Sequence, residues 1–249
     1  MPKELMDVRT SRRRLIVDGI GISVSVGGFG LLYGLSCRAA GLSALEAAAM
    51  SAFVFAGASQ FAAVGYIVGG LPWIGVALLT GFINARHFLY AAALAPFFAD
   101  RPRALRALMA HVLTDEAFAL SIAHFRRIGG ADLFGYWWAA IMVTFIPWNV
   151  ATLAGVLVGG SIPDPTRLGL DVIFPSAMGG LALALVTGRR ELAAAISGAV
   201  IGVCVALAVD PAAGLVAGGL GGPLLAMLVV PQPPPERVTP IIFGEAPRS

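Results

Sequence analysis

The stretch LEAAAMSAFVFAGASQFAAVGYIVGGL, residues 45–71, is long enough to cross a membrane and contains almost nothing polar. Its strongly polar side chains are Glu46, near the start, and Gln60. About 20 mainly apolar residues suffice for a helix to cross the hydrocarbon core of a bilayer. A glutamine in such surroundings is costly unless its amide finds hydrogen-bond partners. The stretch therefore predicts a membrane helix that carries one polar residue with a specific role.

The composition extends this interpretation to the whole chain. Of the 249 residues, 58% are hydrophobic and 12% are charged, whereas an average soluble domain has roughly 25% charged residues. The charges cluster at intervals, and apolar runs of about 20 residues fill the gaps, which is typical of a polytopic helical membrane protein. The short alternating segments of a β-barrel do not occur. We therefore predict an all-α transmembrane bundle.

The charges and the Pro/Gly positions divide this bundle into eight candidate spans. The count is seven if one pair forms a re-entrant hairpin. A basic cytosolic N-terminus, residues 1–14, precedes a transporter domain, residues 15–230, and a proline-rich tail, residues 231–249, follows it. The expected spans are 16–37, 44–69, 72–97, 105–125, 133–159, 168–187, 191–209 and 212–230.

Several of these spans contain helix breakers, among them Pro147 and Pro175. Broken helices are tolerated in membranes where protein or a watery cavity satisfies the freed backbone groups, and transporters use them to build substrate sites. A short echo between residues 55–59, FAGAS, and residues 174–178, FPSAM, raises an inverted repeat as an alternative that the match is too short to decide.

The distribution of positive charge tests the layout. Eight crossings from a cytosolic N-terminus place most of the Lys and Arg inside, as the positive-inside rule requires. Arg101, Arg103 and Arg106 fall outside and contradict it. Either their loop is an exception, or one of the first three apolar segments does not cross fully. We interpret the N-terminal arginines as a membrane anchor and expect no nucleic-acid partner.

Arg86 is the most informative ionisable residue, because it lies in the middle of the segment 72–97. A central arginine costs at least about 2.5–3.5 kcal/mol on insertion scales, so it needs compensation. It can pair with a buried acid, cap a broken helix, or bind a substrate carboxylate in a bidentate manner. Its neighbour Asn84 lies in the same central part of the segment and is therefore also a candidate binding residue.

The segment 105–125 carries His111, Asp115 and Glu116. His111 and Asp115 are four residues apart and share a helical face. One hypothesis is a proton relay in which Asp115 or Glu116 titrates, with Asp171 as a further acid. The alternative is that one acid neutralises Arg86 and keeps its charge.

The remaining polar candidates are Asn149, two residues after Pro147, and the group Gly57, Ser59 and Gln60. Asn149 either contacts substrate or satisfies backbone carbonyls. Gln60 either binds substrate or caps the backbone of a helix break. Nucleotide-binding loops and H-E-x-x-H zinc motifs do not occur in the sequence, so we predict neither an enzyme nor a cofactor or metal site.

Four motifs, taken in order, resemble the AzlC family. They are GLSALEAAAMSAFVFAGASQF (41–61), NARHFLYAAALAP (84–96), LTDEAFAL (113–120) and LGLDVIFPSAM (168–178). The resemblance implies the large subunit of an exporter in the inner (plasma) membrane, driven by the proton gradient. It also implies a small AzlD-type membrane partner. The implied substrates are valine, leucine and isoleucine, with methionine in some members.

A zwitterionic amino acid needs donors for its carboxylate, an acceptor for its ammonium and an apolar pocket. Arg86 and the backbone N–H groups at residues 57–59 are the expected donors. Asp115, Glu116 or Asp171 is the expected acceptor. Two alternatives remain: an exporter of another small amphiphile on the same scaffold, and a membrane scaffold that does not transport.

Overall fold

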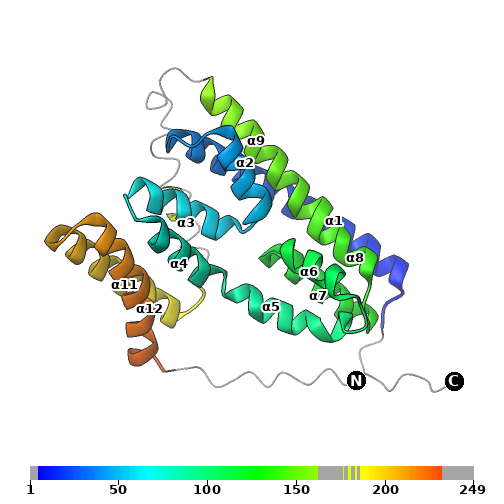
Figure 1. Cartoon of the computed structure of the whole chain (residues 1–249). Coiled ribbons are helices and arrows are strands. Elements are labelled where there is room, and N and C mark those ends of the chain that lie inside the picture. Colours follow the sequence, from blue (N-terminus) through cyan, green and yellow to red (C-terminus); the bar gives the residue numbers. More distant parts are fainter. Residues whose placement is uncertain (1–4, 162–175, 177–178, 181–182, 184–185, 232–249) are drawn as a thin grey trace.

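The computed structural model of the chain describes residues 5–161, 176, 179–180, 183 and 186–231 (Figure 1). The described part is helical and contains no strand, as predicted. Most of the expected span 168–187, with Asp171, lies outside the described residues, as does the tail from residue 232. The helices are α1 (Val8–Ala39), α2 (Ala44–Phe53), α3 (Gly57–Val68), α4 (Trp73–Asn84), α5 (Arg86–Leu94), the 3₁₀ turn η1 (Ala95–Phe98), α6 (Arg103–His111), α7 (Asp115–Ile128), α8 (Leu133–Trp137), the π-helical η2 (Trp138–Phe145), α9 (Ile146–Gly160), α11 (Arg189–Ala208) and α12 (Pro211–Val229).

Five helical segments of the described part are long and apolar enough to cross a membrane. Two of them are composite. The helices α4, α5 and η1 form one segment, and α8, η2 and α9 form another. The five segments are Val8–Ala39, Trp73–Phe98, Leu133–Gly160, Arg189–Ala208 and Pro211–Val229.

The first and third of these segments run parallel and define the two ends of the bundle. A Cβ atom on Gly19 would lie 2.7 Å from Val143 Cγ2, and one on Gly159 would lie 3.1 Å from Arg38 Cβ. Residues early in α1 thus pack on residues early in the third segment, and late residues pack on late ones. We call the end where α1 begins the near end, and the end where α1 finishes the far end.

The helices α2 and α3 form a V that enters from the far end. Ser51, near the end of α2, still lies beside α9, and Phe55 packs on Phe145 with ring centroids 4.8 Å apart. After this tip α3 turns back toward the far end. The evidence is that Phe61 of α3 contacts Tyr33, which lies in the part of α1 nearer the far end. The turn requires Phe55 to adopt φ +39°, a conformation that is rare for a residue with a side chain.

The helices α6 and α7 form a second V that enters from the near end. Phe98, just before α6, packs on Phe125, near the end of α7, with ring centroids 5.7 Å apart. The tip of this V lies between His111 and Asp115, where Thr114 caps α7 by accepting from the N–H of Ala117.

The expected spans 44–69 and 105–125 are therefore not straight crossings. Each is divided into two arms that return to the end from which they entered. The arms of the first contain 10 and 12 residues, about 15–18 Å of helix, which is too short for a core of about 30 Å. The two Vs enter from opposite ends, which is the relationship that an inverted repeat predicts.

Most of the described arginines gather at the near end. The helix α12 starts beside Gly69, at the far end, where a Cβ on Gly69 would lie 2.8 Å from Leu215. At the other end of the α11–α12 pair, Arg190 donates to the Met227 carbonyl oxygen. Of the described arginines, those outside this cluster are Arg38, Arg86, Arg189 and Arg190. The cluster comprises Arg9, Arg12, Arg13, Arg14, Arg101, Arg103, Arg106, Arg126 and Arg127.

This arrangement resolves the misfit in the charge distribution. Because α2 and α3 return to the far end, the chain reaches residue 99 at the near end after two crossings instead of three. The arginines of the loop before α6 thus join the N-terminal arginines. The course of α2 and α3 agrees with the alternative in which one of the first three apolar segments does not cross fully.

Candidate functional site

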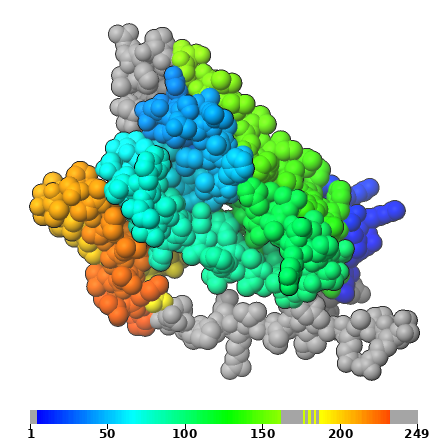
Figure 2. All heavy atoms as spheres, viewed as in Figure 1, coloured from blue at the N-terminus to red at the C-terminus, as the bar shows by residue number. Residues whose placement is uncertain are grey.

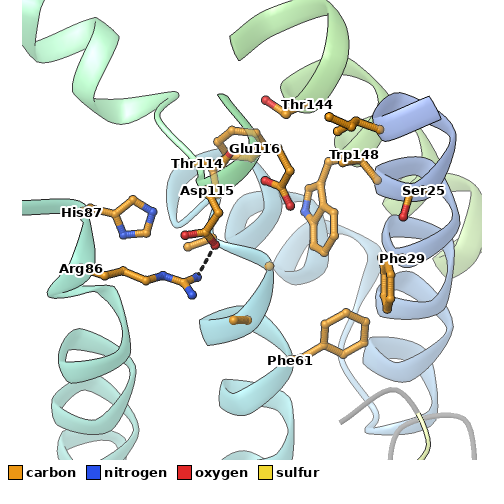
Figure 3. Close-up of a pocket in the computed structure, with 16 residues that line it drawn as sticks. Ser25, Phe29, Phe61, Arg86, His87, Thr114, Asp115, Glu116, Thr144 and Trp148 are labelled. Carbon is orange, nitrogen blue, oxygen red and sulfur yellow. Dashed lines mark ion pairs between the residues drawn. The ribbon is translucent and has the colours of Figure 1, made fainter. Parts of the chain in front are cut away.

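A cavity of about 310 Å³ lies where the two tips meet (Figure 3). Pockets for small molecules usually occupy about 300–1,000 Å³. We call it the central cavity. Its lining comes from α1, both tips, the start of α5, η2 and α9, and consists of Ile22, Ser25, Val26, Phe29, Phe55, Ala56, Gly57, Ala58, Phe61, Arg86, His87, Thr114, Asp115, Glu116, Thr144 and Trp148.

Three helices begin at this cavity. The first residue of α3 is Gly57, that of α5 is Arg86, and that of α7 is Asp115, and all three line the cavity. The first N–H groups of a helix have no partner within the helix, and the helix dipole places partial positive charge there. Neither α3 nor α5 has a side-chain cap. The cavity thus offers backbone donors to an anion.

Arg86 and Asp115 form an ion pair across the cavity, between α5 and α7. Arg86 Nη2 lies 2.9 Å from Asp115 Oδ2. The hydroxyl of Tyr90 donates to the other oxygen, Asp115 Oδ1, at 2.6 Å. Both oxygens of Asp115 are therefore occupied. Arg86 Nε is buried and has no hydrogen-bond partner among the described residues.

Glu116 differs from its neighbour Asp115. It lines the same cavity, but the described part of the chain supplies no hydrogen bond or ion pair to its carboxylate. In Figure 3 its carboxylate points into the space between Asp115 and Trp148. The indole Nε1 of Trp148 is buried and likewise lacks a partner in the described structure. The cavity therefore contains a free acceptor and a free donor close to its ion pair.

The other side of the cavity is apolar. The rings of Phe61 and Trp148 stand edge to face at 6.3 Å between centroids, and Tyr33 stacks on Trp148 from behind at 5.6 Å. Phe29 and Val26 of α1 complete this wall. Aromatic packing of this kind excludes water and favours a hydrocarbon side chain.

The predicted residues Ser59 and Gln60 are fully buried and do not line the central cavity. Gln60 Oε1 accepts from the N–H of Ala56 at 3.1 Å, and Ser59 Oγ donates to the Ala56 carbonyl oxygen at 2.9 Å. These bonds satisfy the backbone that the break at Phe55 exposes. Gln60 Nε2 has no partner among the described residues.

Three other predicted residues lie beside the cavity without lining it. His111 Nε2 lies 3.0 Å from the Ala52 carbonyl oxygen, which links the two tips. Asn149 donates to the Phe145 carbonyl oxygen at 2.9 Å, the structural arrangement that its position after Pro147 allowed. Asn84 Oδ1 is buried and unpaired within the described structure.

Sequence reasoning did not select several residues of the lining, notably Ser25, Thr144 and Trp148. Ser25 and Thr144 stand alone in apolar helices, and small hydroxyl residues of this kind are common in membrane helices. Trp148 had a usable signal, because it follows Pro147 at a predicted break. In the described part of the chain, His, Cys, Asp and Glu do not gather in threes as a metal site would require.

A second polar network lies at the near end, away from the cavity. Ser11 Oγ lies 2.7 Å from His124 Nδ1, and His124 Nε2 lies 2.9 Å from Asp132 Oδ2. Arg12 binds both oxygens of Asp132 at 2.7 Å. The hydrogen bond from Arg12, with a smaller contribution from His124, lowers the pKa of Asp132 to about 2. Ser11 and His124 are fully buried, so the network joins α1 and α7 to the start of α8.

Comparison with known proteins agrees with a membrane protein. The chain is 29% identical over 201 residues to an "Uncharacterized membrane protein" of Archaeoglobus fulgidus, covering 78% of this chain and 84% of the relative. It is 28% identical over 211 residues to the "Inner membrane protein YgaZ" of Escherichia coli, covering 82% and 86%. A shorter match, 32% over 65 residues and 26% of each chain, joins it to the "Branched-chain amino acid transport protein AzlC" of Bacillus subtilis.

Solved structures provide no match to the chain. The family model described as "AzlC protein" matches residues 21–162, which is more than half of the 249 residues. The matched region contains the second half of α1, both Vs and the segment Leu133–Gly160, and it includes every residue that lines the central cavity. The chain is a multi-pass helical membrane protein that belongs to the AzlC family.

Proposed function

We propose that this protein is the large subunit of a two-component exporter of branched-chain amino acids, coupled to the proton gradient. The observation that carries the proposal is the division of the central cavity into three chemical parts. It has donors for a carboxylate, a free acceptor for an ammonium group, and an apolar wall for a hydrocarbon side chain. A small zwitterion with an aliphatic side chain needs these three parts together.

The carboxylate of the amino acid is bound by Arg86 and by the first N–H groups of α3, at Gly57 and Ala58. Arg86 Nε is free for this role even while Nη2 holds Asp115. Glu116 accepts hydrogen bonds from the ammonium group. The apolar side chain packs against Phe61 and Trp148, where a linear chain such as that of methionine also fits.

Glu116 gives this arrangement a coupling mechanism. Its carboxylate can hold a proton or an ammonium group, and one excludes the other. Loading of the substrate on one side of the membrane thus requires Glu116 to lose its proton, and return of the empty carrier favours Glu116 in its protonated form. Mutual exclusion at a single carboxylate is the minimum that proton/amino-acid exchange requires. Asp115, held by Arg86 and Tyr90, is the structural partner of the arginine.

The near end faces the cytosol in this proposal, because the cluster of arginines lies there and cytoplasmic loops carry an excess of Lys and Arg. The membrane is then the cytoplasmic (inner) membrane, with the N-terminus inside. The second component is a small membrane protein of the AzlD type. The name of the Bacillus subtilis relative supports branched-chain amino acids as the substrate class.

The decisive experiment measures uptake into inverted vesicles that contain both subunits. Labelled leucine, valine, isoleucine and methionine are supplied with and without a pH gradient. We expect saturable uptake of at least one branched-chain amino acid, increased by the gradient. Labelled lysine and glutamate serve as controls, because the apolar wall would reject a charged side chain. Saturable uptake of none of the four would refute the proposed substrate class.

A further inference from the structure

A second cavity, of about 180 Å³, lies between α5 and α6 toward the near end. Its lining is apolar apart from one guanidinium and one tyrosine, and includes Ala91, Ala95, Phe98 and Leu113. The guanidinium belongs to Arg106. The hydroxyl of the tyrosine, Tyr136, is already used, because it donates to the Met109 carbonyl oxygen at 2.6 Å. We call this cavity the α5–α6 groove.

The helix α6 contributes both a guanidinium and hydrocarbon to the groove, because Arg106 and Met109 both line it. Met109 is 4% exposed and packs into the protein, whereas Arg103 and Arg106, three residues apart, are exposed. Neither arginine has a hydrogen bond or an ion pair with another described residue. Arg101, by contrast, lies 3.5 Å from the carboxylate of the adjacent Asp100. The groove therefore has two uncompensated positive charges at its side.

The position of the groove adds the third element. The helix α6 begins at the near end, directly after η1, and α5 and α6 lie on the face shown in Figure 2. Because α6 begins just after the candidate span Trp73–Phe98, we expect its two arginines to lie where lipid headgroups meet the hydrocarbon core. A guanidinium matches the geometry of a phosphate, and basic pockets between membrane helices bind anionic headgroups. An apolar groove below them suits an acyl chain.

We propose that the α5–α6 groove binds one anionic phospholipid. Its phosphate is held by Arg106 and Arg103, and one acyl chain enters the groove between Ala95 and Leu113. The lipid would fill the space between the second crossing and the arm that leads to the tip of the second V. This site is separate from the central cavity and does not depend on the transport activity proposed above.

Native mass spectrometry of the full-length protein tests the proposal. The protein is released from detergent after incubation with phosphatidylglycerol or with phosphatidylcholine of the same acyl chains. We expect preferential retention of one phosphatidylglycerol. Arg106→Gln should reduce that retention about tenfold, since it removes a hydrogen bond to a charged group. Ala95→Phe should reduce the retention of both lipids, because the added ring occupies the groove.

Arg13→Gln is the matched control. Arg13 is exposed at the near end, on α1. Its replacement by glutamine removes one positive charge, as Arg106→Gln does, but at a position away from the groove. We expect it to bind phosphatidylglycerol as the wild type does. Equal retention of the two lipids by the wild type, equal losses in Arg106→Gln and Arg13→Gln, or unchanged retention in Ala95→Phe would each overturn the proposal. None of these results depends on transport.

Discussion

Arg86 Nη2 lies 2.9 Å from Asp115 Oδ2, so that the first residue of α5 is joined to the first residue of α7 across the central cavity. The pair fixes two helix starts that would otherwise be held by few contacts. It also compensates the charge of a central arginine, whose cost in a bilayer is at least about 2.5–3.5 kcal/mol. Glu116, one residue further, is left to interact with whatever occupies the cavity.

The first prediction concerns this pair. Arg86→Gln and Asp115→Asn should each abolish export, because either change leaves its partner unpaired beside the substrate. Each should also lower the free energy of unfolding by about 1–2 kcal/mol, between the values for exposed and buried ion pairs. The measurements are export by the two-subunit system and thermal unfolding of the purified variants.

The double variant Arg86→Gln/Asp115→Asn is the control for stability. It should recover part of the lost stability, because no charge is left unpaired, but it should not recover export, because the carboxylate donor is still missing. Wild-type export by either single variant would exclude that residue from the site.

The second prediction separates Glu116 from Asp115. Glu116→Gln should make uptake into inverted vesicles independent of the pH gradient, because a glutamine does not exchange a proton. It should also raise the KM for leucine about tenfold or more, since it removes an acceptor for the ammonium group. The variant should fold normally, because Glu116 has no hydrogen bond or ion pair to lose in the described structure. A gradient effect of wild-type size in Glu116→Gln would place the titrating group elsewhere.

The third prediction tests the two Vs. In a variant without Cys37 and Cys204, single cysteines are placed at Asp100, Gly130 and Ala39. Asp100 and Gly130 should react with a membrane-impermeant maleimide from the same side of the membrane, and Ala39 from the opposite side. Eight straight crossings would instead place Asp100 with Ala39. Labelling of intact cells and of inverted vesicles distinguishes the two layouts without any transport assay.

The fourth prediction concerns the near-end network. The pKa of Asp132 is lowered to about 2 in the folded protein, against about 3.9 for an unperturbed aspartate. The ionised carboxylate therefore contributes its full stabilisation above about pH 4, and this contribution is lost as the pH falls toward 2. Asp132→Asn should lower the unfolding free energy by about 3 kcal/mol at pH 7, and the difference should shrink between pH 4 and pH 3.

Asp18→Asn is the matched control, because Asp18 forms an exposed pair with Arg127 at 3.3 Å. It should cost less than about 1 kcal/mol at any pH. If Asp132→Asn proves no more destabilising than Asp18→Asn at pH 7, the network does not hold α1, α7 and α8 together. Denaturant-induced unfolding followed by tryptophan fluorescence provides both values.

The sequence was sufficient for the fold class and for most helices, because apolar runs of membrane length leave little choice. It was not sufficient for the course of the segments 44–69 and 105–125. Each has the length of a crossing, and its apolar content does not reveal whether two short arms continue or turn back. The misplaced arginines at 101, 103 and 106 were the one sequence signal of the turn.

The residues of the candidate site likewise divide into those that the sequence could reveal and those that it could not. Arg86, Asp115 and Glu116 were predictable because ionisable groups are rare in membrane helices and stand out. The separate environments of Asp115 and Glu116 could not be predicted. Which of the two acids pairs with Arg86 depends on the angle at which α7 starts from the tip of the second V. Residues such as Ser25 and Thr144 could not be selected, because their types are ordinary in apolar helices.

The last prediction addresses Gln60, whose Oε1 holds the N–H of Ala56 at the break. Gln60→Met preserves the shape of the side chain and removes the acceptor. It should destabilise the protein by about 1–3 kcal/mol, the cost of leaving a buried N–H unsatisfied. Because Gln60 does not line the cavity, the KM for leucine should stay within about threefold of the wild type, while the yield of folded protein falls.

Ser59→Ala provides the comparison for Gln60→Met. It removes a bond at the same break, to the Ala56 carbonyl oxygen, and helix carbonyls tolerate this loss better than an N–H tolerates its own. Its effect on stability should therefore be smaller, about 1 kcal/mol. The opposite pattern, a tenfold rise in KM with unchanged stability in Gln60→Met, would assign Gln60 to the substrate instead of the backbone. The two variants thus decide whether Gln60, the polar residue of the stretch 45–71, stabilises the helix break or binds the substrate.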